Sequence, residues 1–180
     1  MALWGMDVKT LPLRTLSTGG RFFFPKGAHE TFDTLAVAWQ HKDFLMEWEN
    51  SAGAVIPPHE RDYGVAFYGT QGTLVADRSK WEVFPQGEKV ATKVVERQGD
   101  AYAIHTANFL ECVRTRNRAT ACTIENGTLC AKYAHLGNIG ARLKHSAPLV
   151  YDEAQKKFDN PEANTFIAPV YRAPWAFPKP

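Results

Sequence analysis

Residues 34–48, TLAVAWQHKDFLMEW, decide the fold, because they contain two apolar runs with strict alternation joined by a short polar connection. Alternation with a period of two is typical of a half-buried β-strand. Residues 40–43 are polar and short enough to join two neighbouring antiparallel strands. The stretch therefore predicts a β-hairpin, and the apolar side chains expected to share a face within each strand are Leu35, Val37 and Trp39, then Phe44, Met46 and Trp48.

Similar patterns on both sides of this hairpin predict more antiparallel strands. An earlier strand is expected over residues 13–24, with a bulge or bend at Gly19-Gly20. Later strands are expected to flank two turns, Thr70-Gln71-Gly72 and Gln86-Gly87-Glu88. The ranges expected for these later strands are 63–69 and 73–77, then 81–84 and 89–95. Residues 50–62 contain too many glycine and proline residues for regular structure.

The second half of the chain has a helical period. Asp100 is a good N-cap for a helix that reaches about Arg116, with an apolar stripe of Ile104, Ala107, Leu110 and Val113. A longer helix is expected over residues 123–144, with an apolar stripe of Leu129, Tyr133, Leu136, Gly140 and Leu143. Gly137 and Gly140 disfavour a helix, and a close approach to the sheet would compensate for that cost.

A short helix begins at Pro161, and an extended tail follows from Pro169. Strands followed by helices indicate an α+β fold: one large, mostly antiparallel open sheet with two main helices packed on one face. The length of 180 residues predicts a single domain, residues 1–180.

Composition excludes several classes of function. The formal charge of +2 is spread along the chain without a basic run, so no nucleic-acid partner is expected. Apolar runs are too short for a membrane span, which predicts a soluble protein. The three cysteines have no C-x-x-C spacing and are expected to be small buried hydrophobic residues. The six histidines lack metal-binding spacing, so no metal site is expected.

Aromatic side chains cannot all lie on one face of the predicted sheet under strict alternation. If Trp39 and Phe67 face the helices, some of Phe44, Trp48, Tyr63 and Tyr68 must lie on the other face. That face then needs a cover. The cover is either a second domain or a second copy of the chain, and the second copy would make a homo-oligomer through the open sheet face.

Three stretches occur in the order typical of one enzyme family: residues 105–116 (HTANFLECVRTR), 134–143 (AHLGNIGARL) and 171–175 (YRAPW). Residues 2–5 (ALWG), 19–22 (GGRF), 30–34 (ETFDT) and 63–74 (YGVAFYGTQGTL) precede them in the same order. Together they resemble the C-terminal domain of the Gfo/Idh/MocA family of nicotinamide-dependent sugar oxidoreductases. The resemblance covers nearly the whole chain.

The resemblance implies a substrate-binding and oligomerisation domain whose complete parent binds NAD or NADP and oxidises or reduces a sugar-like small molecule. The family's G-x-G-x-x-G loop, catalytic lysine and Asp/His pair belong to the N-terminal Rossmann domain, and no residue of this sequence matches them. We therefore expect no catalytic residue and no bound cofactor in this chain alone. A free-standing binding or scaffolding module with the same fold is the alternative. The sequence does not decide between a cytoplasmic and an exported parent.

The candidate substrate-binding residues each have a structural alternative. His105 and Asn108 lie one helical turn apart and either contact a ligand or, for His105, satisfy a backbone group at the sheet edge. Carboxylates in a loop before a strand bind sugar hydroxyls or cap turns. An arginine and an aromatic residue in the tail either close over a sugar ring or pin the tail to the domain. These further candidates are Arg21, Glu30 and Asp33 in the loop and Arg172 and Trp175 in the tail.

Overall fold

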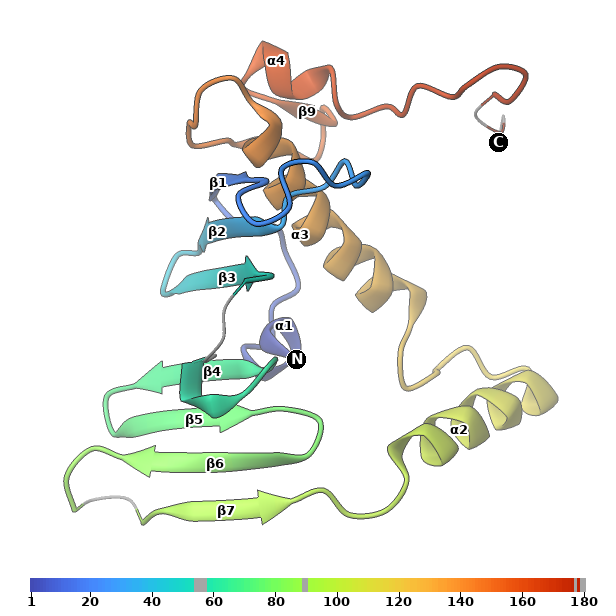
Figure 1. Cartoon of the computed structure of the whole chain (residues 1–180). Helices are drawn as coiled ribbons and strands as arrows, with labels where there is room; N and C mark the ends of the chain where they lie inside the picture. The colour runs from blue at the N-terminus through green and yellow to red at the C-terminus, as the bar shows by residue number, and fades with distance from the viewer. Residues whose placement is uncertain (54–57, 89–90, 177, 179–180) are drawn as a thin grey trace. The chain divides into compact units, whose positions relative to one another are not determined.

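The computed structural model describes residues 1–53, 58–88, 91–176 and 178. The chain forms two compact units. The first unit contains residues 1–9 and 54–127, and the second contains residues 10–53 and 128–180. Antiparallel sheets and two main helices confirm the predicted α+β class (Figure 1).

The second unit is built on a three-stranded antiparallel sheet in the order β1-β2-β3 (Figure 1). Its strands are β1 (Arg14–Gly20), β2 (Thr34–Gln40) and β3 (Leu45–Ser51). The predicted hairpin of residues 34–48 is confirmed, with Gln40 opposite Leu45 at its closed end. Val37 and Trp39 are buried, as the alternation predicts.

Strand β1 is shorter than predicted and ends at Gly20, not at Phe24. The physical reason is a competing acceptor. The backbone N–H groups of Phe22, Phe23 and Phe24 donate to the side-chain carboxylate of Asp33 at 2.8–3.0 Å. The Asp33 carboxylate thus takes the hydrogen bonds that a neighbouring strand would otherwise have to accept. The strand therefore ends before these residues.

Helix α3 (Ile124–Arg142) packs on the three-stranded sheet through the two glycines that the sequence singles out. A Cβ atom at Gly137 would lie 2.9 Å from Val37 Cγ2, and one at Gly140 would lie 2.8 Å from Ser17 Oγ. Any larger side chain would push the helix off the sheet. The expected close approach is confirmed, and Tyr133 and Leu136 of the predicted stripe are buried.

The core of the second unit lies where α3 meets the segment that follows it. Leu149 is 1% exposed, and its backbone N–H and C=O pair with those of Thr15 in β1. The strands β8 (Tyr151–Asp152) and β9 (Lys157–Phe158) form a small hairpin that the sequence did not predict. Helix α4 (Pro161–Asn164) confirms the predicted short helix. The core residues are Leu136, Leu143, Leu149, Phe158 and Ala163.

The first unit contains a four-stranded antiparallel sheet in the order β4-β5-β6-β7 (Figure 1). Both predicted turns join neighbouring strands, although residues 89 and 90 of the last expected strand lie outside the described residues. The strands are β4 (Val65–Gly69), β5 (Gly72–Ala76), β6 (Lys80–Pro85) and β7 (Lys93–Glu96). The first unit also contains two short helices, α1 (Ala2–Gly5) and η1 (Pro58–Glu60). Gly5 of α1 lies against the Phe67 ring of β4.

Helix α2 (Ala101–Thr115) begins where the sequence predicts, because the Asp100 side chain accepts hydrogen bonds from Tyr102 N and Ala103 N. Its expected apolar stripe is exposed: the exposed fraction of Ile104 is 65% and that of Leu110 is 59%. The buried residue of this helix is Cys112, whose thiol lies 3.9 Å from the carbonyl oxygen of Ala119. Periodicity therefore located the helix but not its buried side.

The expectation that all three cysteines are buried was wrong for two of them. Cys112 is buried, whereas Cys122 and Cys130 are exposed. Cys122 lies in the bend before α3, and Cys130 lies on a solvent-facing position of that helix. Across the described residues, no helix has the length and apolar character needed to cross a membrane.

Candidate functional site: a charged groove on the four-stranded sheet

The first unit carries a groove of about 640 Å³ beside the four-stranded sheet. Pockets for small molecules commonly have volumes of roughly 300–1,000 Å³, so the groove has room for a compact ligand. Its lining comes from η1, from the segment between η1 and β4, from the turn between β5 and β6, and from β6. The lining residues are His59, Glu60, Arg61, Asp62, Tyr63, Asp77, Ser79, Lys80, Glu82 and Phe84.

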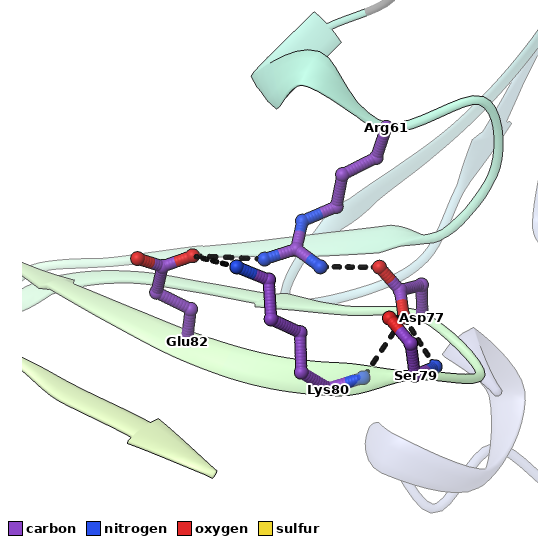
Figure 2. Close-up of polar contacts among 5 residues, drawn as sticks. All are labelled: Arg61, Asp77, Ser79, Lys80 and Glu82. Carbon is purple, nitrogen blue, oxygen red and sulfur yellow. Dashed lines mark hydrogen bonds and ion pairs between the residues drawn. The ribbon is translucent and has the colours of Figure 1, made fainter. Parts of the chain in front are cut away.

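Arg61 is the centre of the groove's polar contacts (Figure 2). Its Nη1 atom donates to Asp77 Oδ2, and its Nη2 atom donates to Glu82 Oε2 at 2.8 Å. The Arg61 side chain is 8% exposed and that of Asp77 is 9% exposed. One guanidinium therefore joins the segment before β4 to the end of β5 and to β6, in the fork geometry that arginine offers to carboxylates.

Asp77 also caps the turn between β5 and β6 (Figure 2). Its Oδ1 atom accepts from Ser79 Oγ at 2.6 Å, from Ser79 N at 2.5 Å and from Lys80 N at 3.0 Å. The Ser79 hydroxyl, these backbone N–H groups and Arg61 hold the pKa of Asp77 well below its usual value. The hydrogen bond to Asp77 in turn raises the pKa of Arg61. Asp77 thus stays charged and keeps Arg61 in place.

The charges of the groove are not balanced. Four carboxylates line it, those of Glu60, Asp62, Asp77 and Glu82, and they face two cations, Arg61 and Lys80. The Lys80 ammonium lies 3.5 Å from Glu82 Oε2, so both cations already have carboxylate partners (Figure 2).

Aromatic side chains form the rest of the wall. The His59 ring lies 6.0 Å from the Phe84 ring and 6.5 Å from the Tyr68 ring, between centroids. His59 Nε2 is 3.5 Å from the Tyr68 hydroxyl. Phe84 is 41% exposed and Tyr63 is 54% exposed, so both side chains present part of their surface at the groove. Aromatic faces beside fixed carboxylates suit a molecule with apolar C–H surfaces and hydroxyl groups.

A smaller groove of about 320 Å³ adjoins the first and shares Tyr63 and Ser79 with it. Its other lining residues are Arg78, Glu96 and Arg97. The Arg78 guanidinium carbon lies 5.4 Å from the centre of the Tyr63 ring, within the range of a cation–π contact. The two grooves therefore differ in charge: the larger one is rich in carboxylates, and the smaller one contains two arginines.

The structure places the predicted loop residues Arg21, Glu30 and Asp33 at one end of the second unit. Arg21 Nη1 donates to the His29 carbonyl at 3.1 Å, and Glu30 is exposed. Asp33 is 5% exposed and acts as a cap, one of the two alternatives for it. Burial opposes its ionisation, but hydrogen bonds from the N–H groups of residues 22–24 and from Thr34 Oγ1 hold its pKa below the usual value.

The remaining predicted residues lie elsewhere in the two units. His105 is exposed on α2, while Asn108 Oδ1 accepts from Ala121 N at 2.9 Å and so ties α2 to the following loop. Arg172 and Trp175 form a turn in the tail, in which Trp175 N donates to Arg172 O at 3.0 Å. His105 and Asn108 belong to the first unit, and the other five candidates belong to the second. Their substrate contacts remain predictions.

Sequence reasoning missed the Arg61 cluster. Its members come from the loop before β4, from the turn between β5 and β6 and from β6, and nothing in their spacing marks a motif. One signal was present: Asp77 follows an apolar strand and precedes Ser79, a pattern typical of a turn capped by a carboxylate. A capped turn next to Lys80 and Glu82 indicates a concentration of charge at one end of the β5–β6 hairpin.

Over the described ranges of the chain, no three His, Cys, Asp or Glu side chains are grouped so that they could hold a metal ion.

Among known protein families, residues 31–177 match one described as "Oxidoreductase family, C-terminal alpha/beta domain". No curated protein and no solved structure matched the chain.

Proposed function

The chain belongs to the Gfo/Idh/MocA oxidoreductase family, whose C-terminal alpha/beta domain it contains, and from this premise we propose that it binds the substrate and joins subunits of a sugar-converting enzyme. The family's enzymes are NAD(P)-linked oxidoreductases. In this proposal a separate dinucleotide-binding domain supplies the hydride carrier and the catalytic groups. The chain described here supplies a ligand groove and an assembly surface, and it is inactive alone.

The groove around Arg61 is the observation that carries the substrate-binding part of the proposal. Its guanidinium is fixed between Asp77 and Glu82, so the carboxylates keep one arrangement in the absence of ligand. Groups that are already held in place lose little freedom when a ligand binds. Carboxylate oxygens accept hydrogen bonds from hydroxyl groups, and the partly exposed ring of Phe84 offers an apolar surface to a sugar ring.

Exposed aromatic side chains support the assembly part of the proposal. Trp48 in β3 is 46% exposed, and Tyr68 in β4 is 77% exposed. Large aromatic residues on a sheet face are enriched where proteins associate, because burying them removes much apolar area from water. We expect a second copy of the chain to cover one of these sheet faces.

A titration tests the substrate-binding part. Uniformly ¹⁵N-labelled protein is titrated with D-glucose and followed by amide chemical shifts. We expect concentration-dependent shifts at residues 59–63 and 77–84, with α3 amides as the internal reference. Shifts that are absent from the groove up to the solubility limit of glucose, or that appear uniformly along the chain, would contradict the proposal.

Two further measurements test the division of labour. Calorimetry with NADH is expected to show no binding to the chain alone, and micromolar affinity would contradict the proposed dependence on a separate domain.

Light scattering at increasing protein concentration is expected to show a mass above 20.1 kDa, the mass of one chain. A mass that stays at one chain up to high micromolar concentration would contradict assembly through the sheet.

A further inference from the structure

We propose that the Arg61 groove distinguishes sugars by charge: it accepts neutral and cationic polyols, amino sugars above all, and rejects sugar phosphates and uronates. This inference rests on the proposed function of the groove as the sugar site and names the class of substrate that the groove takes. It follows from which charged groups in the groove already have partners and which remain free.

Both cations of the groove are committed to carboxylates of the protein. Arg61 donates through Nη1 to Asp77 and through Nη2 to Glu82, and Lys80 lies 3.5 Å from the same Glu82 oxygen. An anionic ligand would have to break these pairs or lie beside carboxylates without a counter-charge. Either event carries an electrostatic cost that a neutral sugar avoids.

The groups that remain available to a ligand are mainly acceptors. Glu60 and Asp62 are exposed and have no ion pair among the described residues. Glu82 uses its Oε2 atom for both cations, which leaves Oε1 for a ligand. Carboxylates accept hydrogen bonds and attract positive charge, so hydroxyl and ammonium groups complement them.

One buried donor also lacks a partner. The Arg61 side chain is 8% exposed, and its Nε atom is buried and makes no hydrogen bond within the described residues. Buried N–H groups in proteins are nearly always paired, so an unpaired one indicates a missing oxygen. A water molecule supplies that oxygen without adding negative charge. A neutral polyol therefore meets the free acceptors of the groove and leaves the buried Arg61 pairs intact.

The adjoining smaller groove sharpens the inference because its charge is opposite. Arg78 and Arg97 line it, and Arg78 lies over the Tyr63 ring at 5.4 Å. An anionic sugar attracted to the protein should therefore perturb the amides of Arg97 and Glu96 in preference to those of the larger groove. Site-resolved measurement separates the two cases.

Three sugars of similar size test the proposal: D-glucosamine, D-glucose and D-glucuronate. Each is titrated into the labelled chain at about pH 6.5, where an amine is largely protonated, and at low ionic strength. Exposed charge pairs contribute modestly, so we expect glucosamine to bind about two- to fivefold more tightly than glucose, with glucuronate weakest at residues 59–63. Added salt should remove the difference between glucosamine and glucose.

A matched pair of variants assigns the preference to the groove. The double variant Glu60→Gln/Asp62→Asn keeps side-chain size and removes two negative charges, and it should lower glucosamine affinity to that of glucose while glucose affinity stays unchanged. Glu88→Gln removes an exposed carboxylate that does not line the groove, and it should change neither affinity.

The possible failures are distinguishable. If glucose shifts the groove amides but glucosamine binds no more tightly, or glucuronate binds equally well there, charge selection is wrong and the sugar site stands. If the double variant keeps the full preference for glucosamine, the carboxylates named here do not cause it. If none of the three sugars shifts residues 59–63 or 77–84, the proposed sugar site itself is wrong.

Discussion

The two sheets of the molecule bury different kinds of groups. The three-stranded sheet meets α3 through Gly137 and Gly140, so that backbone and small side chains pack at short range. The four-stranded sheet instead keeps a nearly buried arginine between two carboxylates at the edge of a groove. Tight apolar packing gives stability without leaving room for a ligand, whereas fixed charges beside an open groove give recognition. Under the proposed function, the three-stranded sheet is the scaffold and the four-stranded sheet carries the ligand site.

The largest effect is expected from the core of the scaffold. Leu149→Ala removes a side chain that is 1% exposed and leaves a cavity between β1 and α3. We expect a loss of about 2–5 kcal/mol in the free energy of unfolding, measured with urea. Val170→Ala, at a position that is 98% exposed, should change it by less than about 0.5 kcal/mol. Equal effects of the two variants would contradict the assignment of the core.

A smaller effect is expected from the glycine contact. Gly137→Ala should lower the free energy of unfolding by about 1–3 kcal/mol, because its Cβ would meet Val37 at 2.9 Å, although alanine favours helix. Gly127→Ala lies in the same helix with no atom within 4 Å of the added Cβ, and it should raise stability by up to about 1 kcal/mol. The opposite signs are the test. Two stabilising substitutions would show that α3 does not press on the sheet.

The next effect is expected from the polar contact of the scaffold. The Tyr133 hydroxyl donates to the Thr10 carbonyl at 2.9 Å and lies 3.0 Å from His41 Nε2. Burial raises the pKa of Tyr133 to about 12, so the hydroxyl stays protonated as a donor. Tyr133→Phe should cost about 1 kcal/mol in the urea-unfolding free energy. A neutral effect would indicate that water replaces these hydrogen bonds.

Much of the secondary structure is predictable from the sequence because its signals are local. Asp100 marks the start of α2 through the hydrogen bonds that an N-cap makes, and alternation over residues 34–48 fixes both the hairpin and the burial of Val37 and Trp39. Gly137 and Gly140 were informative for the same reason: two costly residues in one helix need a packing reason. The β8–β9 hairpin has strands of two residues each, too short for a periodic pattern.

The groove was not predictable because it depends on contacts distant in sequence. Arg61 binds Asp77 and Glu82, which are 16 and 21 residues away, and only the pairing of β5 with β6 brings these partners together. Asp33 illustrates the converse case. Its type suits sugar hydroxyls, but its oxygens accept three backbone N–H groups, a role decided by the path of the loop.

The smallest effect is expected from a change in pH, because the contribution of Asp77 does not vary near neutral pH. Hydrogen bonds from Ser79 and Lys80, with Arg61, hold the pKa of Asp77 below the usual 3.8, so the folded chain binds this proton more weakly than the unfolded chain. Lowering the pH therefore favours unfolding: the contribution of Asp77 is complete above about pH 5 and is lost progressively as the pH falls below about 4.

Asp77→Asn isolates this contribution. The difference in urea midpoint between the natural chain and the variant should be constant above about pH 5 and shrink towards pH 3, because Asp77 takes up a proton in the unfolded chain while the folded chain keeps it charged. Gly127→Ala adds no ionisable group, so its difference from the natural chain should stay constant over the same range. An equally constant difference for Asp77→Asn would mean that the turn and Arg61 do not stabilise the charged carboxylate. The four-stranded sheet would then not differ from the three-stranded sheet in holding a fixed charge.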